Sequence, residues 1–261
     1  MYDLAAMEAA LADSIFRGKL HFAAVTASTN NDALGGARSG APHGSVWFAD
    51  EQTAGRGRGG HAWQSSAGEG LYVSVLLRLR LAPERLLLLP LAAGLAAAEA
   101  IHGTSGIKID LRWPNDLLIG PAKAGGILVE AGTEPASAGF VVVGVGINVH
   151  QRSFDRGLAT PATSLDLASG CKIGRQPLLI ALLESLEREA RGLDEADSAA
   201  AIPARVAAAS SWVRGRRVEV HGPQACTGVT AGLDEHGFLR VETAAGLVTV
   251  QTGGIRAQEI D

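Results

Sequence analysis

Apolar residues recur at two different spacings over residues 1–210, and this predicts helices and strands in one mixed layer. Helical spacing marks Asp3–Arg17, and Ser28 or Thr29 is placed to cap a following helix. The other predicted helices are Pro83–His102, Pro177–Leu193 and Ala199–Ser210, with Pro203 at an early helical position that tolerates proline. The strand-like runs are Leu20–Val25, Ser45–Asp50, Leu71–Arg80, Ile107–Trp113, Leu117–Ile119, Gly126–Glu130 and Phe140–Val149. We therefore expect an α+β domain built on a mixed sheet.

The pattern changes after Trp212. Four short alternating runs follow, RRVEV, GVTAGL, FLRVE and GLVTV, and glycine-containing turns separate them. Such runs are typical of a small all-β barrel of roughly fifty residues. The sequence thus predicts two domains, residues 1–210 and residues 211–261.

Charge and composition narrow the choice of partners. The chain of 261 residues has a net charge of −4 and a pI near 6.0, which disfavours nucleic acid or an anionic membrane as the main partner. The apolar run Leu86–Ala98 contains Pro90 and is shorter than a bilayer span, so we expect it in the core. Asp3 and Glu8 interrupt the first turns, unlike a signal peptide, and a cytoplasmic location is expected.

The two cysteines, Cys171 and Cys226, lie far apart in the sequence. The chain has no CxxC, no HExxH and no histidine cluster. We therefore expect reduced, inert thiols and no protein-bound metal.

The segment Ser45–Trp63, SVWFADEQTAGRGRGGHAW, carries the strongest chemical signal. Its glycines let the backbone turn tightly and approach a ligand, and the planar guanidinium groups of Arg56 and Arg58 match a carboxylate or a phosphate. An apolar strand leads directly into this loop. The loop is therefore predicted to bind an anion.

Several other interpretations of the same loop are weaker. Gly55, Gly57 and Gly60 fit GxGxxG, but a strand rather than a helix is expected next, and no acidic residue follows at the distance typical of a dinucleotide site. Gly60 is followed by His61 and alanine, whereas a P-loop needs lysine and serine or threonine. An RGG-type RNA tether would be longer and repetitive. A purely structural surface loop stays open as an alternative.

Four further segments begin or end predicted strands: Ser28–Asn30, Trp113–Asp116, Lys123–Glu130 and Gly144–Val149. Each has a simple structural explanation by itself, as a helix cap, a turn, a surface charge or a close-packed strand. Loops at one edge of a sheet commonly form a binding site together. Their combination with the glycine and arginine loop favours one shared site.

In this order and spacing, STN, DEQTAGRGRGG, WPNDL, KAGGILVE and GVGIN resemble the biotin protein ligases, from about Ser28 to Asn148. These enzymes activate biotin with ATP and transfer it to a carrier-protein lysine. The resemblance implies a catalytic domain of the class II synthetase-like, biotin-lipoate ligase type and a C-terminal SH3-like barrel. It also implies ATP, nucleotide-borne Mg²⁺ and biotin as reactants, and a biotin carboxyl carrier protein as partner.

The resemblance also assigns residues. The biotin site would comprise Ser28, Thr29, Asn30, Gln52, Gly55, Arg56, Gly57, Arg58, Lys123 and Gly126. The nucleotide site would comprise Arg58, Trp63, Asn115, Asp116, Lys123 and Asn148. Catalytic roles would fall to Lys123, Arg58 and Asp116, and no residue would ligate a metal directly.

The residue types themselves suit this chemistry. Attack of a carboxylate on the α-phosphate of ATP brings two anions together, and at about 4 Å they repel by about 4 kcal/mol at an effective dielectric constant of about 20. Arg56, Arg58 and Lys123 would offset this repulsion by charge stabilisation and positioning. Asp116 is a candidate to accept or orient the proton of the carrier amine.

Two alternatives and one departure from the family pattern remain. A lipoate ligase shares the adenylation chemistry, and a biotin-binding sensor without turnover would keep only the ligand pocket. His61 stands where the family commonly carries an arginine, so triphosphate contacts there are in doubt.

The short segment before Val25 leaves no room for a helix-turn-helix domain, so no DNA binding is expected. A monomer or weak homodimer is expected, with a glycine and arginine loop that is mobile until ligand binds.

Overall fold

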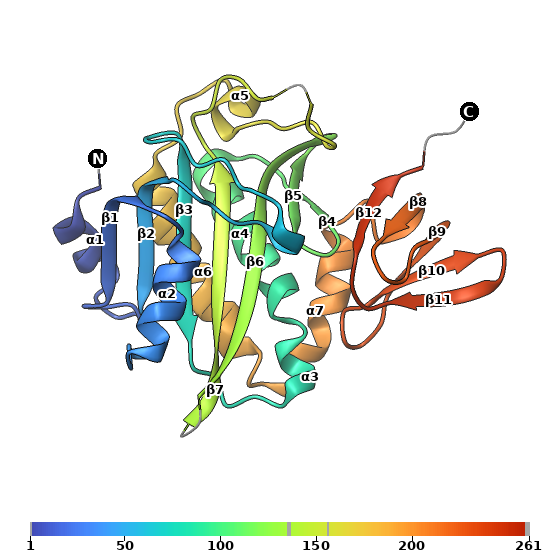
Figure 1. The fold of residues 1–261 in the computed structure, drawn as a ribbon, viewed down its shortest axis with the longest axis horizontal. Coiled ribbons are helices and arrows are strands. Elements are labelled where there is room, and N and C mark those ends of the chain that lie inside the picture. The colour runs from blue at the N-terminus through green and yellow to red at the C-terminus, as the bar shows by residue number, and fades with distance from the viewer. Residues whose placement is uncertain (1, 135–136, 156, 259–261) are drawn as a thin grey trace.

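The computed structural model describes residues 2–134, 137–155 and 157–258. A seven-stranded mixed sheet forms its centre, with strand order β1-β2-β3-β7-β6-β5-β4 (Figure 1). Its strands are β1 (Leu20–Thr26), β2 (Val46–Gln52), β3 (Gly70–Leu77), β4 (Asp110–Arg112), β5 (Asp116–Ile119), β6 (Ala122–Glu134) and β7 (Ser137–Asn148). The β1–β2 pair is parallel and all other neighbours are antiparallel. The predicted α+β class with a mixed sheet is confirmed.

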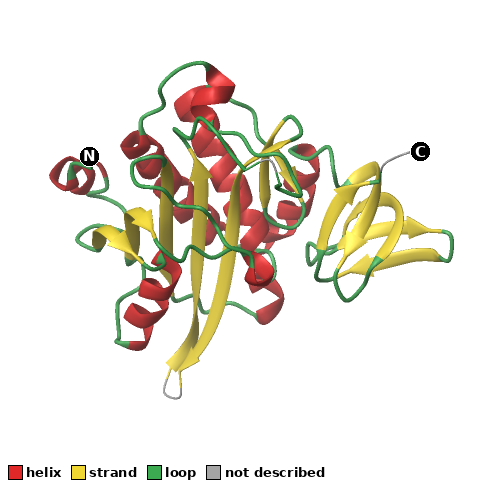
Figure 2. Cartoon of the chain, turned by 45° about the horizontal axis from the view of Figure 1, so that its top comes forward, coloured by secondary structure: helices red, strands yellow, loops and turns green. Residues whose placement is uncertain are grey.

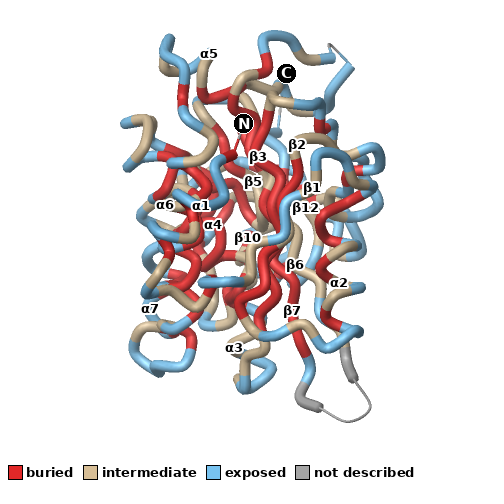
Figure 3. Tube along the Cα trace, turned by 90° about the vertical axis from the view of Figure 1, so that its left-hand side faces the viewer, coloured by how far each residue is buried: buried red, intermediate tan, exposed pale blue. Residues whose placement is uncertain are grey.

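Helices cover the two faces of the sheet unequally. The helices and one short 3-10 helix are α1 (Leu4–Ala10), α2 (Thr29–Arg38), η1 (Arg58–Gly60), α3 (Pro83–Leu86), α4 (Leu89–Ser105), α5 (Leu165–Ser169), α6 (Arg175–Gly192) and α7 (Ala196–Ala208). In Figure 3, α4, α6 and α7 lie on one side of the sheet and α2 lies on the other. Leu182 and Ala93 belong to the larger apolar core, and a smaller cluster containing Ala33, Leu76 and Phe140 packs beneath α2.

The predicted helix Pro83–His102 is divided in the structure into α3 and α4. Pro90 occupies the first turn of α4, where its missing N–H costs nothing, whereas inside one continuous helix its ring would clash with the preceding turn. Gly106 ends α4 in the left-handed conformation with φ of 72°. The span Pro83–Ser105 is long and apolar enough to cross a bilayer by length and composition, but just over half of its most apolar stretch is buried within this fold, as expected for a core helix.

Other sequence predictions need correction at their boundaries. Helix α7 begins at Ala196 instead of Ala199, so Pro203 lies inside the helix and not near its start. Helix α5 was not predicted, because five residues are too few to show helical periodicity. Ser28 is the N-cap of α2 as predicted, but its side chain makes no capping hydrogen bond.

A five-stranded antiparallel sheet follows, with order β11-β10-β9-β8-β12, and Figure 2 shows it beside the helix-containing body. Its strands are β8 (Arg214–His221), β9 (Cys226–Leu233), β10 (Leu239–Thr243), β11 (Gly246–Val250) and β12 (Gly254–Ala257). Four of these strands match the predicted runs, and the architecture is consistent with an SH3-like barrel. We call residues 214–257 the barrel.

The barrel and the larger domain share one apolar core. Val218 and Leu239 of the barrel belong to the same buried cluster as the residues of α4 and α6. At the contact, the Trp113 indole Nε1 donates to the carbonyl oxygen of Gly237 at 3.0 Å. The domain boundary at Ser210 stays a prediction, and the barrel strands begin four residues beyond it.

Candidate functional site

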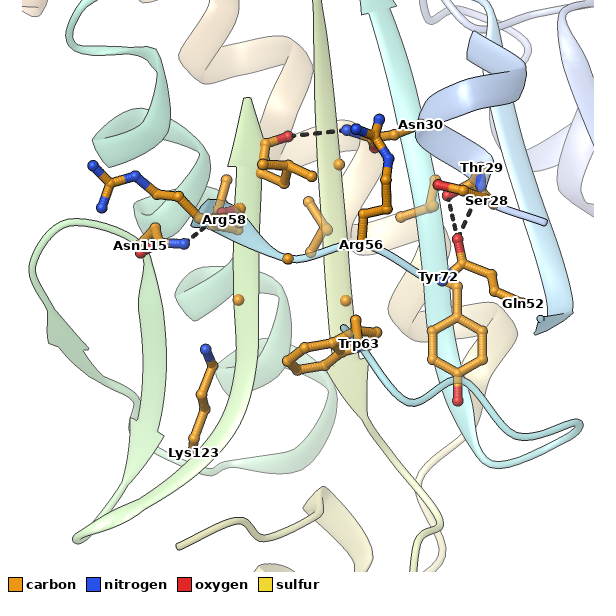
Figure 4. Close-up of a pocket in the computed structure, with 18 residues that line it drawn as sticks. Ser28, Thr29, Asn30, Gln52, Arg56, Arg58, Trp63, Tyr72, Asn115 and Lys123 are labelled. Atoms are coloured by element: carbon orange, nitrogen blue, oxygen red, sulfur yellow. Dashed lines mark hydrogen bonds between the residues drawn. The ribbon is translucent and has the colours of Figure 1, made fainter. Parts of the chain in front are cut away.

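A pocket lies where the glycine and arginine loop crosses strands β3, β7 and β6 (Figure 4). Predicted site residues that line it are Ser28, Thr29, Asn30, Gln52, Arg56, Gly57, Arg58, Trp63, Asn115, Lys123 and Gly126. The structure thus brings together four segments that lie up to about one hundred residues apart in the sequence. Hydroxyl and amide groups gather at one end of the pocket, and Lys123 lies toward the other.

The polar end of the pocket is held by Gln52. The backbone N–H and the hydroxyl of Thr29 both donate to Gln52 Oε1, at 2.9 and 3.1 Å. Gln52 Nε2 donates to the Ser65 hydroxyl at 2.7 Å. These bonds fix the Gln52 amide with its oxygen toward the start of α2 and its nitrogen toward Ser65, which follows the loop. The pocket wall is therefore preformed without ligand.

Asn30 is anchored by protein groups on both sides of its amide. Its Nδ2 donates to Glu130 Oε2 at 2.8 Å, and its Oδ1 accepts from the Ser74 hydroxyl at 2.5 Å. Gly144 lies directly beneath this amide, and a Cβ at that position would collide with it. The amide nitrogen and the amide oxygen of Asn30 both have protein partners. Asn30 therefore mainly connects parts of the pocket wall.

Arg56 and Arg58 point to different partners, although both lie in the loop. The Arg56 guanidinium forms a bidentate ion pair with Glu130: Nη1 lies 3.0 Å from Oε1 and Nη2 lies 2.5 Å from Oε2. Arg58 extends away from Arg56 (Figure 4). Its Nη2 donates to the Thr252 hydroxyl of the barrel at 2.8 Å, and its Nη1 donates to the Gly253 carbonyl. Burial lowers the pKa of the Arg58 guanidinium, and Asp116 partly offsets this.

Lys123 belongs to a charged cluster beside the pocket. Its Nζ lies 2.5 Å from Asp116 Oδ1, and the other carboxylate oxygen accepts from Arg112 Nε and Nη2 at 3.0 and 2.6 Å. The ammonium also lies 5.5 Å from the centroid of the Trp63 ring, which is within cation–π range. Asp116 therefore sits between two cations and orients the lysine.

The residues assigned to the nucleotide side surround Trp63. Its indole covers Gly146, where any Cβ would come within 2.7 Å of the ring, and its Nε1 has no hydrogen-bond partner within the described part of the chain. Asn115 Nδ2 donates to the Ile127 carbonyl at 2.7 Å, and Asn148 Nδ2 donates to the Thr163 carbonyl at 3.0 Å. A buried N–H without an acceptor is a ready donor for a ligand.

Three predicted site residues do not line the pocket but support it. Gly55 lies close to the Trp63 carbonyl and to Ser65. Asp116 forms an ion pair with Lys123, and Asn148 Nδ2 donates to the Lys123 carbonyl. The pocket also contains residues that we did not select from the sequence, namely Tyr72, Val73, Ile127, Leu128, Gly144, Val145 and Gly146. Most of these lie in the KAGGILVE and GVGIN segments, so their position in the motifs was the available signal. Among the described residues, no group of three His, Cys, Asp or Glu side chains is placed to hold a metal ion.

The fold and pocket define an α+β domain in which a loop with two arginines lies across a mixed sheet and lines one pocket together with Lys123. The model of the Biotin/lipoate A/B protein ligase family matches residues 22–148. A Mycobacterium tuberculosis protein named Biotin--[acetyl-CoA-carboxylase] ligase is 35% identical over 243 residues, which cover 91% of this chain and 88% of that protein. The chain belongs to the Biotin/lipoate A/B protein ligase family.

Other relatives extend the comparison. The Bifunctional ligase/repressor BirA of Bacillus spizizenii is 40% identical over 169 residues, 64% of this chain, but the chain spans only about half of that relative, 52%. Among solved structures, the biotin protein ligase from Aquifex aeolicus in complex with biotin and ATP has a TM-score of 0.78 at 29% identity, covering 92% of this chain and 98% of that chain. The similarity therefore includes the barrel.

Proposed function

We propose that this chain is a biotin protein ligase. It would join biotin to ATP as biotinyl-5'-AMP and then transfer biotin to a lysine of a carrier protein. The main support is one pocket that has hydroxyl and amide groups at one end and is lined by Arg56, Arg58 and Lys123 elsewhere. The polar end suits the ureido head of biotin, and the cations suit its carboxylate and the phosphates.

In the first step, the biotin carboxylate attacks the α-phosphate of ATP, and pyrophosphate leaves. Lys123 and the two loop arginines would offset the repulsion between the reacting anions, and Mg²⁺ carried by the nucleotide would add further positive charge. Arg58 must leave Thr252 and Gly253 to take part. Trp63 would offer its ring face and its free N–H to the nucleotide.

In the second step, the amine of a carrier lysine attacks the mixed anhydride, biotinyl-lysine forms and AMP leaves. The attacking amine must be uncharged, and we keep Asp116 as the candidate that accepts or orients its proton. The Asp116 ion pair with Lys123 would give Asp116 a second task, because it fixes the ammonium that would face the adenylate.

The partner would be the biotin carboxyl carrier protein of an acyl-CoA carboxylase. Two relatives, from Mycobacterium tuberculosis and Paracoccus denitrificans, are named for acetyl-CoA-carboxylase as the acceptor. We also propose a cytoplasmic location, a monomer or weak homodimer, and no DNA or membrane partner. The net charge of −4 supports the last two proposals.

The direct test is to incubate the purified chain with biotin, MgATP and a biotin carrier domain, and to measure the mass of the carrier by mass spectrometry. The proposal requires biotinyl-lysine on the carrier and pyrophosphate in solution. Calorimetry with lipoate separates the lipoate ligase alternative, which would bind lipoate in preference to biotin. Biotin binding without pyrophosphate release would instead indicate a sensor.

A further inference from the structure

Glu130 is a charged residue at the pocket wall that neither the motifs nor the chemistry above assigns to a task. It lies on β6, a central strand of the sheet, while its partner Arg56 lies in the loop. Both oxygens of the carboxylate bind the guanidinium, with Oε1 at 3.0 Å and Oε2 at 2.5 Å. Arg56 lines the pocket, whereas Glu130 does not. The edge of the Arg56 guanidinium that binds Glu130, formed by Nη1 and Nη2, therefore faces the pocket wall.

Glu130 is also held independently of Arg56. Asn30 Nδ2 donates to Glu130 Oε2 at 2.8 Å, and the fully buried Ser74 hydroxyl fixes the other end of the Asn30 amide. The carboxylate is therefore attached to the sheet through a chain of hydrogen bonds. Of the two partners in the ion pair, Arg56 is the one on a glycine-rich segment that can move.

The other two pocket cations differ from Arg56 in their partners. Arg58 binds a hydroxyl and a carbonyl, both uncharged, and Lys123 shares Asp116 with Arg112. Only in the Arg56 pair does a single carboxylate bind a single loop cation, among the three cations that line the pocket. An incoming anion that uses this edge of Arg56 must take the place of a carboxylate that is already there.

We propose that Glu130 is the resident counter-anion of Arg56, a positioning residue that holds the guanidinium at the pocket rim and that the ligand carboxylate or phosphate displaces. This inference rests on the proposed function, since it takes biotin as the ligand. Glu130 then lowers the affinity for the anionic ligand while it keeps the loop ordered in the empty site.

The test compares Glu130→Gln with the wild type by calorimetry, with biotin and with biotinamide, in which an uncharged carboxamide replaces the carboxylate. Glutamine keeps an acceptor for Asn30 and removes the charge. We expect biotin to bind more tightly to the variant, by at most about fivefold because an ion pair this exposed contributes little. Biotinamide affinity should not change, because that ligand brings no anion to exchange.

Two control variants locate the effect. Glu99→Gln removes the same charge from the exposed Glu99–Arg188 pair on α4 and α6 and should leave both affinities unchanged. In an Arg56→Gln background, Glu130→Gln should have no further effect on biotin affinity. Unchanged or weaker biotin binding in Glu130→Gln, equal tightening for biotinamide, or additive effects in the double variant would each overturn the inference alone. A wild type that binds no biotin would overturn the proposed function and this inference together.

Discussion

Ser74 shows how much of the pocket depends on a residue outside every motif. It is fully buried on β3, and its hydroxyl lies within hydrogen-bonding distance of both Thr29 and Asn30. It therefore joins the start of α2 to the sheet beneath the pocket. Its partners lie 44 and 45 positions away in the sequence, so no local pattern could indicate this role.

We expect Ser74→Ala to weaken biotin binding measurably and to lower the free energy of unfolding by about 1–2 kcal/mol, because Asn30 loses its buried donor. Calorimetry and urea denaturation measure the two effects. Ser45→Ala is the matched control, since Ser45 is also fully buried and donates to the Pro42 carbonyl away from the pocket. It should lose stability without any loss of biotin affinity. Equal biotin affinity in Ser74→Ala and wild type would contradict the role of Ser74.

His43 makes stability depend on pH. Burial, and then the nearby Lys19, lower the pKa of its imidazole, while Glu187 raises it. The backbone N–H of Arg78 donates to His43 Nδ1 at 3.0 Å, which requires that nitrogen to be unprotonated. Because the folded-state pKa is the lower one, this stabilisation is complete above the unfolded pKa of about 6.5 and is lost as the pH falls through the folded pKa.

The measurement is the free energy of unfolding in urea at pH 7.5 and pH 5. His43→Asn keeps an acceptor near the position of Nδ1 but cannot be protonated. We expect the loss of stability on acidification to be smaller in this variant than in the wild type. Identical losses in the two proteins would show that another group carries the pH dependence.

At the scale of elements, the glycine and arginine loop is fastened by polar contacts at two points. Arg56 binds Glu130 on the sheet, and Arg58 binds Thr252 and Gly253 on the barrel. The expectation of a mobile loop rested on its lack of apolar side chains alone. Neither the acceptors on the barrel nor Glu130 could be found from the loop sequence, because they lie 74 to 195 positions away.

Thr252→Val removes one of the two acceptors that hold Arg58. We expect trypsin to cut the ligand-free loop about twofold to fivefold faster in this variant, because a hydrogen bond of this kind stabilises the held state by about 1 kcal/mol or less. Biotin and MgATP should restore protection. Thr243→Val is the control, since Thr243 lies in the same barrel and donates to Gly246. Equal cleavage rates for Thr252→Val and wild type would contradict the contact.

The strands were predicted more successfully than the helix boundaries. Alternation and long apolar runs identified every strand of the central sheet, because a strand buried on both faces, such as Gly70–Leu77, is apolar at nearly every position, with Ser74 as the exception. Strand β12 was missed because only four residues pair with β8. The break between α3 and α4 and the early start of α7 depend on single turns, which periodicity does not resolve.

The same contrast holds for the site. Residues that lie within short motifs, such as Gln52, Arg56 and Lys123, could be selected because their types suit anions and polar ligands. The lining from β7 and the partner carboxylate Glu130 also lie within the quoted motifs, but they were not selected, because their roles depend on strand register and not on residue type. Sequence therefore indicates which groups are present, while the register decides which of them meet.

At the scale of the whole molecule, Gly237 is one of the points where the barrel contacts the larger domain. Its φ of +78° is unfavourable for other residues, and a Cβ there would lie 2.5 Å from Leu91 Cδ1 and 3.2 Å from Leu88 Cδ2. Its carbonyl accepts from the Trp113 indole. This turn therefore fits closely against α4 and the end of β4.

We expect Gly237→Ala to lower the free energy of unfolding by about 1–3 kcal/mol, from backbone strain together with displacement of the two leucines. Gly215→Ala is a matched control, because Gly215 has a φ of +73° and nothing within 4 Å of a built Cβ. Urea denaturation should show a larger loss for Gly237→Ala. Equal losses would mean that strain alone acts and that the fit against α4 contributes nothing.

The link between Arg58 and the barrel also suggests a practical use of this chain as an optical reporter. If Arg58 exchanges Thr252 and Gly253 for a ligand, the distance between the loop and the barrel changes when biotin binds. A pair of dyes at exposed positions, His61 in the loop and Ala245 in the barrel, would convert that change into energy transfer. Replacing both free cysteines, the exposed Cys171 and the partly buried Cys226, with serine would reserve the labelling chemistry for the two new thiols.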